Sequence, residues 1–361
     1  MVFTLATFNV NNLFVRYRFG RTFAGDMSGR SAVTNPQDGY LPMYDPDLFD
    51  LFNADQRRMA ARVLTGDGTR ELPEVLCLQE VESLIALRRF NELHLGSAYP
   101  YALLIDSRDF RQIDVAVLSK FPIIGARSHV DDLDPMPDDP ARPWLFSRDC
   151  VEVEIALGPG AGTDTGADRL TVFVNHFKSK FVDPFRNRTP EERSAARQKA
   201  ADHRGRQATA VAQLLAKRFP GSTYDTELFA VVGDLNDEPS AAPITPLLAV
   251  GLTNALDRIE PEPRRWTHWW RGQNTVSQLD YLLLSPALAE ATDGIEPRIE
   301  RRGISFVRVL TDGLPGPRLT RFRRNDDDQA PVPVDFRFRR FDQVSTSVYA
   351  SDHCPVFLDV P

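Results

Sequence analysis

Short apolar segments that end abruptly on Asn, Asp, Glu or His constrain this chain more than any other feature. They recur along the sequence as "FNVNN", "CLQE", "VNHF", "VVGDLND", "QLDY" and "ASDHCP". The apolar letters are typical of short buried strands. Because ligand sites in α/β folds often gather at strand ends, the pattern predicts that side chains far apart in sequence converge on one rim of a sheet.

Strand-like and helix-like segments interleave without a strict repeat, which predicts an α/β protein with mixed sheets. Strands are expected at residues 3–9, 74–78, 101–105, 114–119, 150–157, 169–177, 228–234 and 278–285, and helices at 48–64, near 83–95 and at 189–218. For the last helix, the segment "TPEE" predicts a capped start, with Thr189 as the cap, Pro190 in the first turn and Glu192 closing the capping box.

The length of 361 residues would by itself favour about two domains. A single domain over residues 1–361 is expected instead, because the polar strand ends reach from the first ten residues to the last ten. Two long segments, 16–47 and 291–349, are expected to be inserted loops that shape specificity. Loops longer than about 15 residues are usually functional or disordered.

Charge and hydropathy limit the partners. The net charge of −7 argues against a broad electrostatic clamp on nucleic acid, although it does not exclude a nucleic-acid substrate. No apolar run approaches the roughly 20 residues of a spanning helix, so no stable membrane insertion is expected. The N-terminus begins as a strand without a basic leader, so a cytoplasmic location is expected. Cys77, Cys150 and Cys354 are scattered in apolar contexts and are expected to be reduced core thiols.

The polar residues at the strand ends offer many oxygen ligands and little sulfur. Such a set suits Mg²⁺, and also Mn²⁺ or Ca²⁺, better than zinc. Histidines beside it can bind phosphate oxygens or move a proton. The combination predicts metal-assisted hydrolysis of a phosphate ester. Signatures of competing chemistries, GxSxG, GKS or GKT, and HExxH, are absent from the sequence.

Six motifs in order, "TFNVNN", "LQEVE", "NHFKSK", "GDLND", "LDYLLLSP" and "SDHCPV", resemble the endonuclease/exonuclease/phosphatase superfamily from about residue 3 to 360. Its members include pancreatic-type deoxyribonuclease, abasic-site endonucleases, bacterial sphingomyelinases and inositol polyphosphate 5-phosphatases. The resemblance implies a four-layer α/β sandwich, in which two packed mixed β-sheets are flanked by helices. It also implies a Mg²⁺-dependent phosphoesterase.

The resemblance assigns metal-side roles to three residues. Glu80 resembles the principal Mg²⁺ ligand, Asn9 the first active-site asparagine, and Asp352 a further metal-side carboxylate. Asn11 falls where relatives often carry Asp or Glu, and is a weaker candidate for contacting substrate. A neutral amide at that position would weaken cation binding or shift the site toward a single ion.

The resemblance also implies catalytic roles. Asp234 and Asn236 resemble the pair that orients the attacking water. His353 resembles the histidine that contacts the scissile phosphate, and Asp280 the carboxylate that hydrogen-bonds it. His176 resembles the second histidine of deoxyribonuclease and sphingomyelinase relatives, a candidate acid for the leaving oxygen.

Residues outside these motifs receive weaker assignments. Arg111 lies where relatives place a polar loop that contacts phosphate, and Asp106 is a candidate partner for His176. Four other histidines match no motif and are expected to be structural: His94, His129, His203 and His268. The segment "RRWTHWWRG" (264–272) could stack on bases, sit at a lipid interface, or form part of a hairpin core.

The leading hypothesis is a Mg²⁺-dependent nuclease, endonuclease-like, that cuts a phosphodiester by in-line attack of water. Its expected partner is therefore a nucleic acid. The second hypothesis keeps this chemistry but gives it a small phosphomonoester or a phospholipid headgroup as substrate. The third is a non-catalytic binding module of the same fold.

Overall fold

The computed structural model describes residues 2–14, 54–158, 169–183, 187, 189–270, 275–304, 318–319, 336–337, 340–345 and 348–361. The predicted loop 16–47 lies outside these residues, as do most of the predicted loop 291–349 and residues 48–53 of the predicted helix 48–64. Within the described part, no helix combines the length and the apolar character that crossing a membrane requires.

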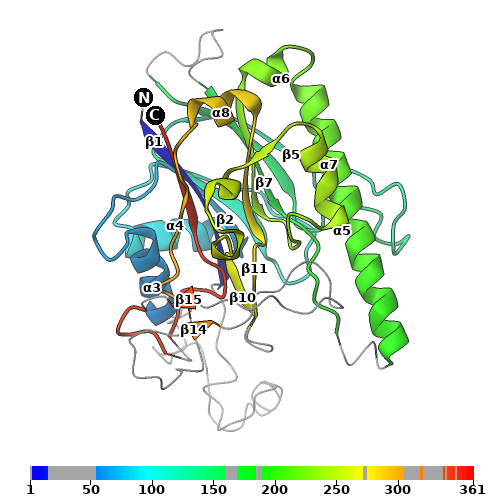
Figure 1. Ribbon diagram of the computed structural model, residues 1–361, viewed down its shortest axis with the longest axis horizontal. Helices are drawn as coiled ribbons and strands as arrows, with labels where there is room; N and C mark the ends of the chain where they lie inside the picture. The colour runs from blue at the N-terminus through cyan, green and yellow to red at the C-terminus, as the bar shows by residue number, and fades with distance from the viewer. Residues whose placement is uncertain are drawn as a thin grey trace, which may run out of the picture.

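Two mixed sheets of six strands each form the centre of the molecule (Figure 1). The first has the order β13-β16-β1-β2-β4-β3, with strands β13 (Arg298–Ile299), β16 (Val356–Val360), β1 (Phe3–Leu13), β2 (Val75–Val81), β4 (Asp114–Ser119) and β3 (Tyr101–Leu104). The second has the order β5-β6-β7-β8-β12-β9, with β5 (Ile123–Ser128), β6 (Cys150–Ala156), β7 (Arg169–His176), β8 (Leu228–Asp234), β12 (Asp280–Leu284) and β9 (Thr253–Asn254).

Each sheet contains one parallel pair at its centre, β1 with β2 and β7 with β8, while its other pairs are antiparallel. The sequence therefore predicted mixed sheets correctly. Two small antiparallel pairs lie apart from the large sheets: β10 (His268–Trp270) with β11 (Thr275–Ser277), and β14 (Arg318–Leu319) with β15 (Phe336–Arg337).

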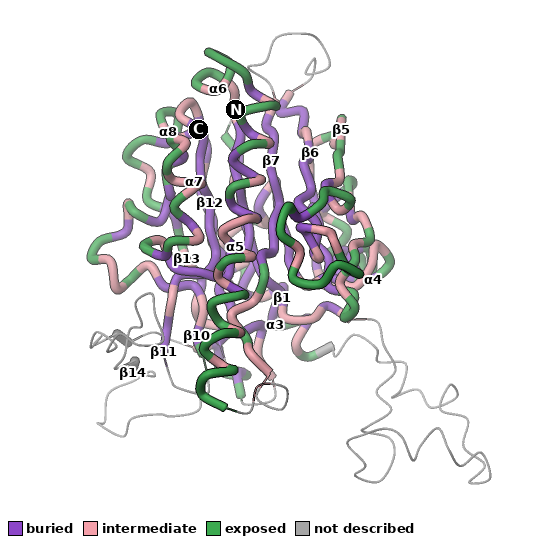
Figure 2. The backbone as a smooth tube through the Cα atoms, turned by 90° about the vertical axis from the view of Figure 1, so that its right-hand side faces the viewer, coloured by how far each residue is buried: buried purple, intermediate pink, exposed green. Residues whose placement is uncertain are grey.

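The two large sheets pack face to face through an apolar core. Alternate residues of each strand enter it, such as Val75 and Cys77 from one sheet and Val172 and Val232 from the other. Successive side chains of a strand point to opposite faces of its sheet. Because both faces of each sheet are covered here, both sets of side chains are apolar, and the strands appear in the sequence as continuous apolar runs. Figure 2 shows these strands as mostly buried. All three cysteines are buried and free, as predicted.

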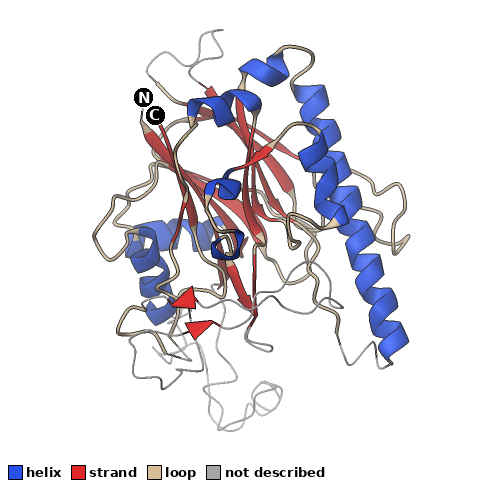
Figure 3. Cartoon of the chain, viewed as in Figure 1, coloured by secondary structure: helices blue, strands red, loops and turns tan. Residues whose placement is uncertain are grey.

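Helices cover the outer faces and complete four layers (Figure 3). On one side α3 (Ala54–Leu64) and α4 (Leu84–His94) pack on the first sheet, and on the other side α5 (Pro190–Arg218) and α7 (Thr245–Ala249) pack on the second. The predicted sandwich architecture is confirmed. Shorter helices, α6 (Thr223–Thr226), α8 (Pro286–Ala291) and the 3₁₀ turns Ala242–Ile244, Ala255–Arg258 and Glu262–Arg264, connect the strands.

The long helix α5 begins as the sequence predicts. The side chain of Thr189 accepts a hydrogen bond from the backbone N–H of Glu192, over 3.1 Å, and the carboxylate of Glu192 accepts one from the backbone N–H of Thr189, over 2.9 Å. Pro190 occupies the first turn, where its missing N–H costs nothing. The first part of the helix is exposed, and its later part packs on the second sheet.

Candidate active site

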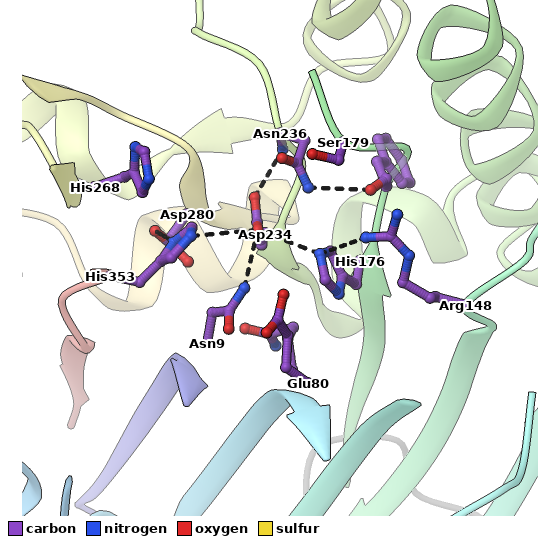
Figure 4. Close-up of polar contacts among 12 residues, drawn as sticks. Asn9, Glu80, Arg148, His176, Ser179, Asp234, Asn236, His268, Asp280 and His353 are labelled. Carbon is purple, nitrogen blue, oxygen red and sulfur yellow. Dashed lines mark hydrogen bonds and ion pairs between the residues drawn. The ribbon is translucent and has the colours of Figure 1, made fainter. Parts of the chain in front are cut away.

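Asp234 lies at the centre of a cluster of polar side chains (Figure 4). Its Oδ2 accepts a hydrogen bond from Asn9 Nδ2 over 3.1 Å, and its Oδ1 accepts one from the backbone N–H of Asn236 over 2.8 Å. The Nε2 atoms of His176 and His353 lie 3.4 Å and 3.7 Å from Asp234 Oδ2. The polar strand ends therefore converge on one rim, as the sequence predicted.

The two parallel strand pairs produce this convergence. In the register of β7 and β8, His176 lies opposite Asp234, so both side chains leave neighbouring strands at the same level. Gly233 precedes Asp234 with a φ of +127°, and a Cβ atom at this glycine would lie only 2.0 Å from the carbonyl oxygen of Asn175. Only glycine fits this close approach of the two strands.

Glu80 occupies an irregular position near the end of β2. The register with the neighbouring strand shifts between Gln79 and Val81, and Glu80 itself has a φ of +66°. Bulges of this kind re-aim a side chain, and a left-handed backbone is uncommon for Glu, so the strain is a sign of function. Figure 4 shows Glu80 beside Asn9, with its carboxylate pointing toward Asp234.

The electrostatics of Glu80 are those of a carboxylate without enough positive charge around it. Its Oε2 accepts a hydrogen bond from the backbone N–H of Asn12 over 3.0 Å. Burial, and then the negative charge of Asp352, raise the pKa of Glu80, while His353 and Arg148 oppose the rise. The ionised carboxylate is therefore costly to keep there unless a cation accompanies it.

The surroundings of His353 favour the positively charged form of its ring. Its Nδ1 lies 2.9 Å from Asp280 Oδ2, so the predicted hydrogen bond between these residues is present. Burial alone would lower the pKa of His353, but Asp280 and Asp234 outweigh it and raise that pKa well above its usual value. The backbone N–H of Asp280 is held by Thr267 Oγ1 over 3.0 Å, which fixes the carboxylate that orients the ring.

Asn236 has a φ of +54°, and its Nδ2 donates to the carbonyl oxygen of Phe177 over 3.1 Å. Burial is the main cause that raises the pKa of Asp234.

Asp352 is more open, with a side chain 45% exposed, and could meet an ion or substrate from solvent. Asn11 donates its backbone N–H to Asn9 Oδ1 over 3.1 Å and so supports Asn9 directly.

Arg148 is a site residue that sequence reasoning missed. It is buried, its Nη1 lies 2.5 Å from His176 Nε2, and its Nε lies 3.2 Å from Asp109 Oδ2. The predicted pair of Asp106 and His176 is wrong, because among the described residues His176 Nε2 contacts Arg148 and Asp234, and its Nδ1 has no hydrogen-bond partner. Its place two residues before β6 was a signal, because the start of an antiparallel strand lies beside the end of its neighbour, here β7.

His268 matches no motif and was expected to be structural, and the structure places it beside the cluster. It forms an isolated antiparallel bridge with His353, and the two rings lie 4.6 Å apart. Its Nε2 is 4.0 Å from Asp352 Oδ2. Burial, together with the charge of His353, lowers the pKa of His268 to about 4, so its ring is neutral near pH 7. His203, by contrast, contacts the carbonyl oxygen of Leu145 over 2.9 Å, away from this cluster.

Exposed positive charge lies on the His176 side of the cluster. Arg111 is held to Asp109 through its backbone N–H, over 2.9 Å, and its charge helps to lower the pKa values of His176 and Lys178. Both Arg111 and Lys178 are exposed. The weak prediction that Arg111 lies near the reacting centre is therefore compatible with its place in the structure.

Comparison with known proteins identifies the family. The sequence model of the endonuclease/exonuclease/phosphatase family matches residues 6–353. The chain belongs to this family. Members of the endonuclease/exonuclease/phosphatase family are metal-dependent hydrolases of phosphoester bonds, so the predicted phosphoester chemistry stands at that level.

Solved structures with the same fold include sphingomyelinase C from Streptomyces griseocarneus, at 17% identity, a TM-score of 0.51 and full coverage of both chains. SmcL matches at 14% identity and a TM-score of 0.52, over 100% of this chain and 99% of its own. An endonuclease/exonuclease/phosphatase from Bacteroides vulgatus matches at 10% identity and a TM-score of 0.51, with 100% and 99% coverage. A sequence search finds no match among curated proteins.

The residues present fit the hard cation on which this family depends. Asp234, Asp280 and His353 offer ligand atoms within 4.8 Å of one another, but His353 Nδ1 and Asp280 Oδ2 already form a hydrogen bond with each other over 2.9 Å. The oxygens of Glu80, Asn9 and Asp352 form a better set, because Mg²⁺ prefers oxygen ligands. A divalent ion near Glu80 would also remove the repulsion from Asp352 that raises the pKa of Glu80.

Proposed function

We propose that this member of the endonuclease/exonuclease/phosphatase family is a Mg²⁺-dependent nuclease, endonuclease-like, that cleaves a phosphodiester by in-line attack of water. The observation that carries the proposal is the position of two histidines around one buried carboxylate. His176 Nε2 and His353 Nε2 lie 3.4 Å and 3.7 Å from Asp234 Oδ2. Both ring nitrogens therefore face the same carboxylate oxygen, which supports the assignment of all three groups to one reacting centre.

In this mechanism Asp234 and Asn236 orient the attacking water. Burial raises the pKa of Asp234, which makes its carboxylate a better acceptor for the proton of the water. The backbone N–H of Asn236 holds Asp234 Oδ1 and the side chain of Asn9 holds Oδ2, and a remaining lone pair of the carboxylate accepts from the water. The fixed carboxylate thus supplies orientation as well as basicity.

His353 binds the scissile phosphate as an imidazolium. Asp280 holds Nδ1–H, so the Nε2–H is the donor directed at the phosphate oxygen. A fixed, charged donor of this kind stabilises the negative charge of the transition state without reorganisation. His176 acts on the opposite side, toward the leaving oxygen.

Glu80 and Asn9, with Asp352 assisting, would hold Mg²⁺ in this proposal, and Mn²⁺ and Ca²⁺ take the same oxygen ligands. When bound, the ion supplies a Lewis acid that polarises a phosphoryl oxygen. Asn12 contributes by holding Glu80 Oε2 through its backbone N–H, which directs the second carboxylate oxygen into the site.

The charge distribution supports a polyanionic substrate. Arg111 and Lys178 are exposed beside His176, so phosphates that flank the scissile one would meet positive charge on this side. Local fields of this kind attract nucleic acid even when the net charge of the protein is negative.

The test uses supercoiled plasmid DNA with the purified protein and Mg²⁺. Nicking is expected, it should stop in excess EDTA, and it should return when Mg²⁺ is restored. His353→Ala should lower the rate by about 10²–10³-fold, since the variant loses a positioned donor. His203→Ala is the matched control, because His203 is a partly buried histidine outside the cluster, and it should keep its activity. Undiminished nicking in EDTA or by His353→Ala would refute the proposal.

A second candidate, a phospholipase C-like phosphodiesterase, is favoured by one observation. Trp270 is 44% exposed at the end of β10, on the same short strand as His268 of the cluster. An exposed tryptophan suits a lipid interface as well as a base. Phosphocholine release from sphingomyelin vesicles without nicking of DNA would select this candidate over the nuclease.

A further inference from the structure

The contact between Arg148 and His176 restricts what His176 can do. Both side chains are 3% exposed, and Arg148 Nη1 lies 2.5 Å from His176 Nε2. On its other side the guanidinium Nε lies 3.2 Å from Asp109 Oδ2, whose side chain is 6% exposed. The three groups therefore form a buried line, Asp109–Arg148–His176, that ends at the reacting centre.

Hydrogen-bond chemistry fixes the direction of this contact. A guanidinium has five N–H donors, no acceptor, and remains charged in proteins. His176 Nε2 must therefore accept, which places the ring proton on Nδ1. That Nδ1 is buried and has no hydrogen-bond partner among the described residues. Burial, and next the charge of Arg148, hold the pKa of His176 well below its usual value, in agreement with a neutral ring.

We propose that Arg148 is a positioning residue that fixes His176 as the neutral Nδ1–H tautomer, so that His176 does not protonate the leaving oxygen. This inference rests on the proposed phosphodiesterase function and refines the expected role of His176 as an acid. Asp109 holds the guanidinium in place. With His176 neutral, the positive charge on the His176 side of the scissile phosphate is that of Arg148.

The tautomer can be measured directly, without any substrate. Long-range ¹H–¹⁵N correlation spectra distinguish Nδ1–H, Nε2–H and imidazolium, and His176→Gln assigns the signal among only six histidines. The wild-type protein near pH 7 should show Nδ1–H for His176. Arg148→Gln, which removes the charge, should shift the signal toward Nε2–H or imidazolium. An Nε2–H or imidazolium state in the wild type would overturn the proposal.

Leaving-group dependence tests the catalytic consequence. A general acid matters most when the leaving oxygen is strongly basic, and commonly contributes about 10²–10⁴-fold. His176→Gln should therefore slow bis-(p-nitrophenyl) phosphate and a dinucleoside phosphate by the same factor, within about threefold. A loss of about 10²-fold or more that is confined to the dinucleoside phosphate would show that His176 is the acid, and would overturn the proposal.

Chemical rescue separates positioning from folding. Arg148→Ala should lose most activity toward bis-(p-nitrophenyl) phosphate and recover at least tenfold in millimolar guanidinium, well below denaturing concentrations. Arg204→Ala is the matched control, since Arg204 is also buried and ion-paired, with its Nε 2.9 Å from Asp237 Oδ2, but its side chain makes no hydrogen bond to a histidine among the described residues. Guanidinium should not accelerate it. A folded Arg148→Ala without rescue would overturn the proposal, whereas a wild-type protein inactive on both diesters would overturn the proposed function alone.

Discussion

Two glutamates at the margins of the first sheet show what separates a structural carboxylate from a functional one. Glu300 follows β13 and is surrounded by positive charge: Arg70 Nη2 lies 3.1 Å from its Oε2, and Arg302 Nε lies 2.9 Å from its Oε1. Burial would raise the pKa of Glu300, but these partners outweigh it and lower that pKa. Glu80 has the opposite balance, because burial and Asp352 raise its pKa.

The difference teaches that the protein can neutralise a buried glutamate fully, and does so where the carboxylate only holds loops together. At Glu80 the positive charges of the described residues do not outweigh burial and Asp352, and the backbone is strained as well. The negative charge of Glu300 is neutralised by neighbouring arginines, whereas that of Glu80 is not. This difference indicates that a positively charged ligand binds beside Glu80.

The largest expected effect is the loss of activity in Glu80→Gln. This change preserves the size of the side chain and removes its charge, so catalysis should fall by about 10²–10³-fold while the fold is retained. The measurement is the rate of plasmid nicking, with circular dichroism as the check on folding. Wild-type activity in this variant would contradict the functional role assigned to Glu80.

Glu300→Gln should have the reverse profile. Removing one member of a buried ion-pair network leaves Arg70 and Arg302 without their anion, at a cost of about 3 kcal/mol of stability, the low end for such changes because both arginines are partly exposed. Urea denaturation measures the loss. Specific activity per folded molecule should stay at the wild-type level, and a large fall in it would show that this carboxylate is not purely structural.

The stabilisation of the folded protein by Mg²⁺ should also distinguish Glu80 from Glu300, with a smaller effect. A Mg²⁺ concentration a hundred times the Kd should stabilise the wild-type protein by about 2.7 kcal/mol, since the ion binds only the folded state. Glu80→Gln should lose most of this increase and Glu300→Gln should keep it. Thermal unfolding with and without Mg²⁺ gives the answer, and an equal increase in all three proteins would place the ion elsewhere.

The smallest expected effect is the pH dependence that Glu300 contributes. Its pKa is lower in the folded protein than its ordinary value of 4.5, so its contribution to stability is present above pH 4.5 and is lost as the pH falls through the folded pKa. The difference in unfolding free energy between the wild type and Glu300→Gln should therefore shrink as the pH drops below 4.5. A difference that does not change over this range would contradict the assignment.

Much of the fold and of the site followed from local sequence patterns. The continuous apolar runs fixed the central strands because both faces of each sheet are buried, and "TPEE" located the start of α5 because the capping box is a local structure. The polar ends placed Asp234, His353 and Asp280 in one cluster, because strand ends share an edge.

What the sequence could not supply was pairing across distance. Arg148 and His268 belong to no motif, and they reach the cluster only through the register of β6 beside β7 and of β10 beside the segment that holds His353. Asp106 and Asp109 lie in one polar turn, and the sequence of a turn does not reveal which of its carboxylates points inward.

The glycine before Asp234 has a practical consequence for anyone who wishes to retarget this enzyme. Since the main chains of β7 and β8 touch at that point, the spacing of His176 and Asp234 is inherited from the scaffold itself. Directed evolution can diversify the surrounding rim freely, provided that Gly233 is left invariant in the library. A methyl group there would push the two reactive side chains apart before any new specificity could be selected.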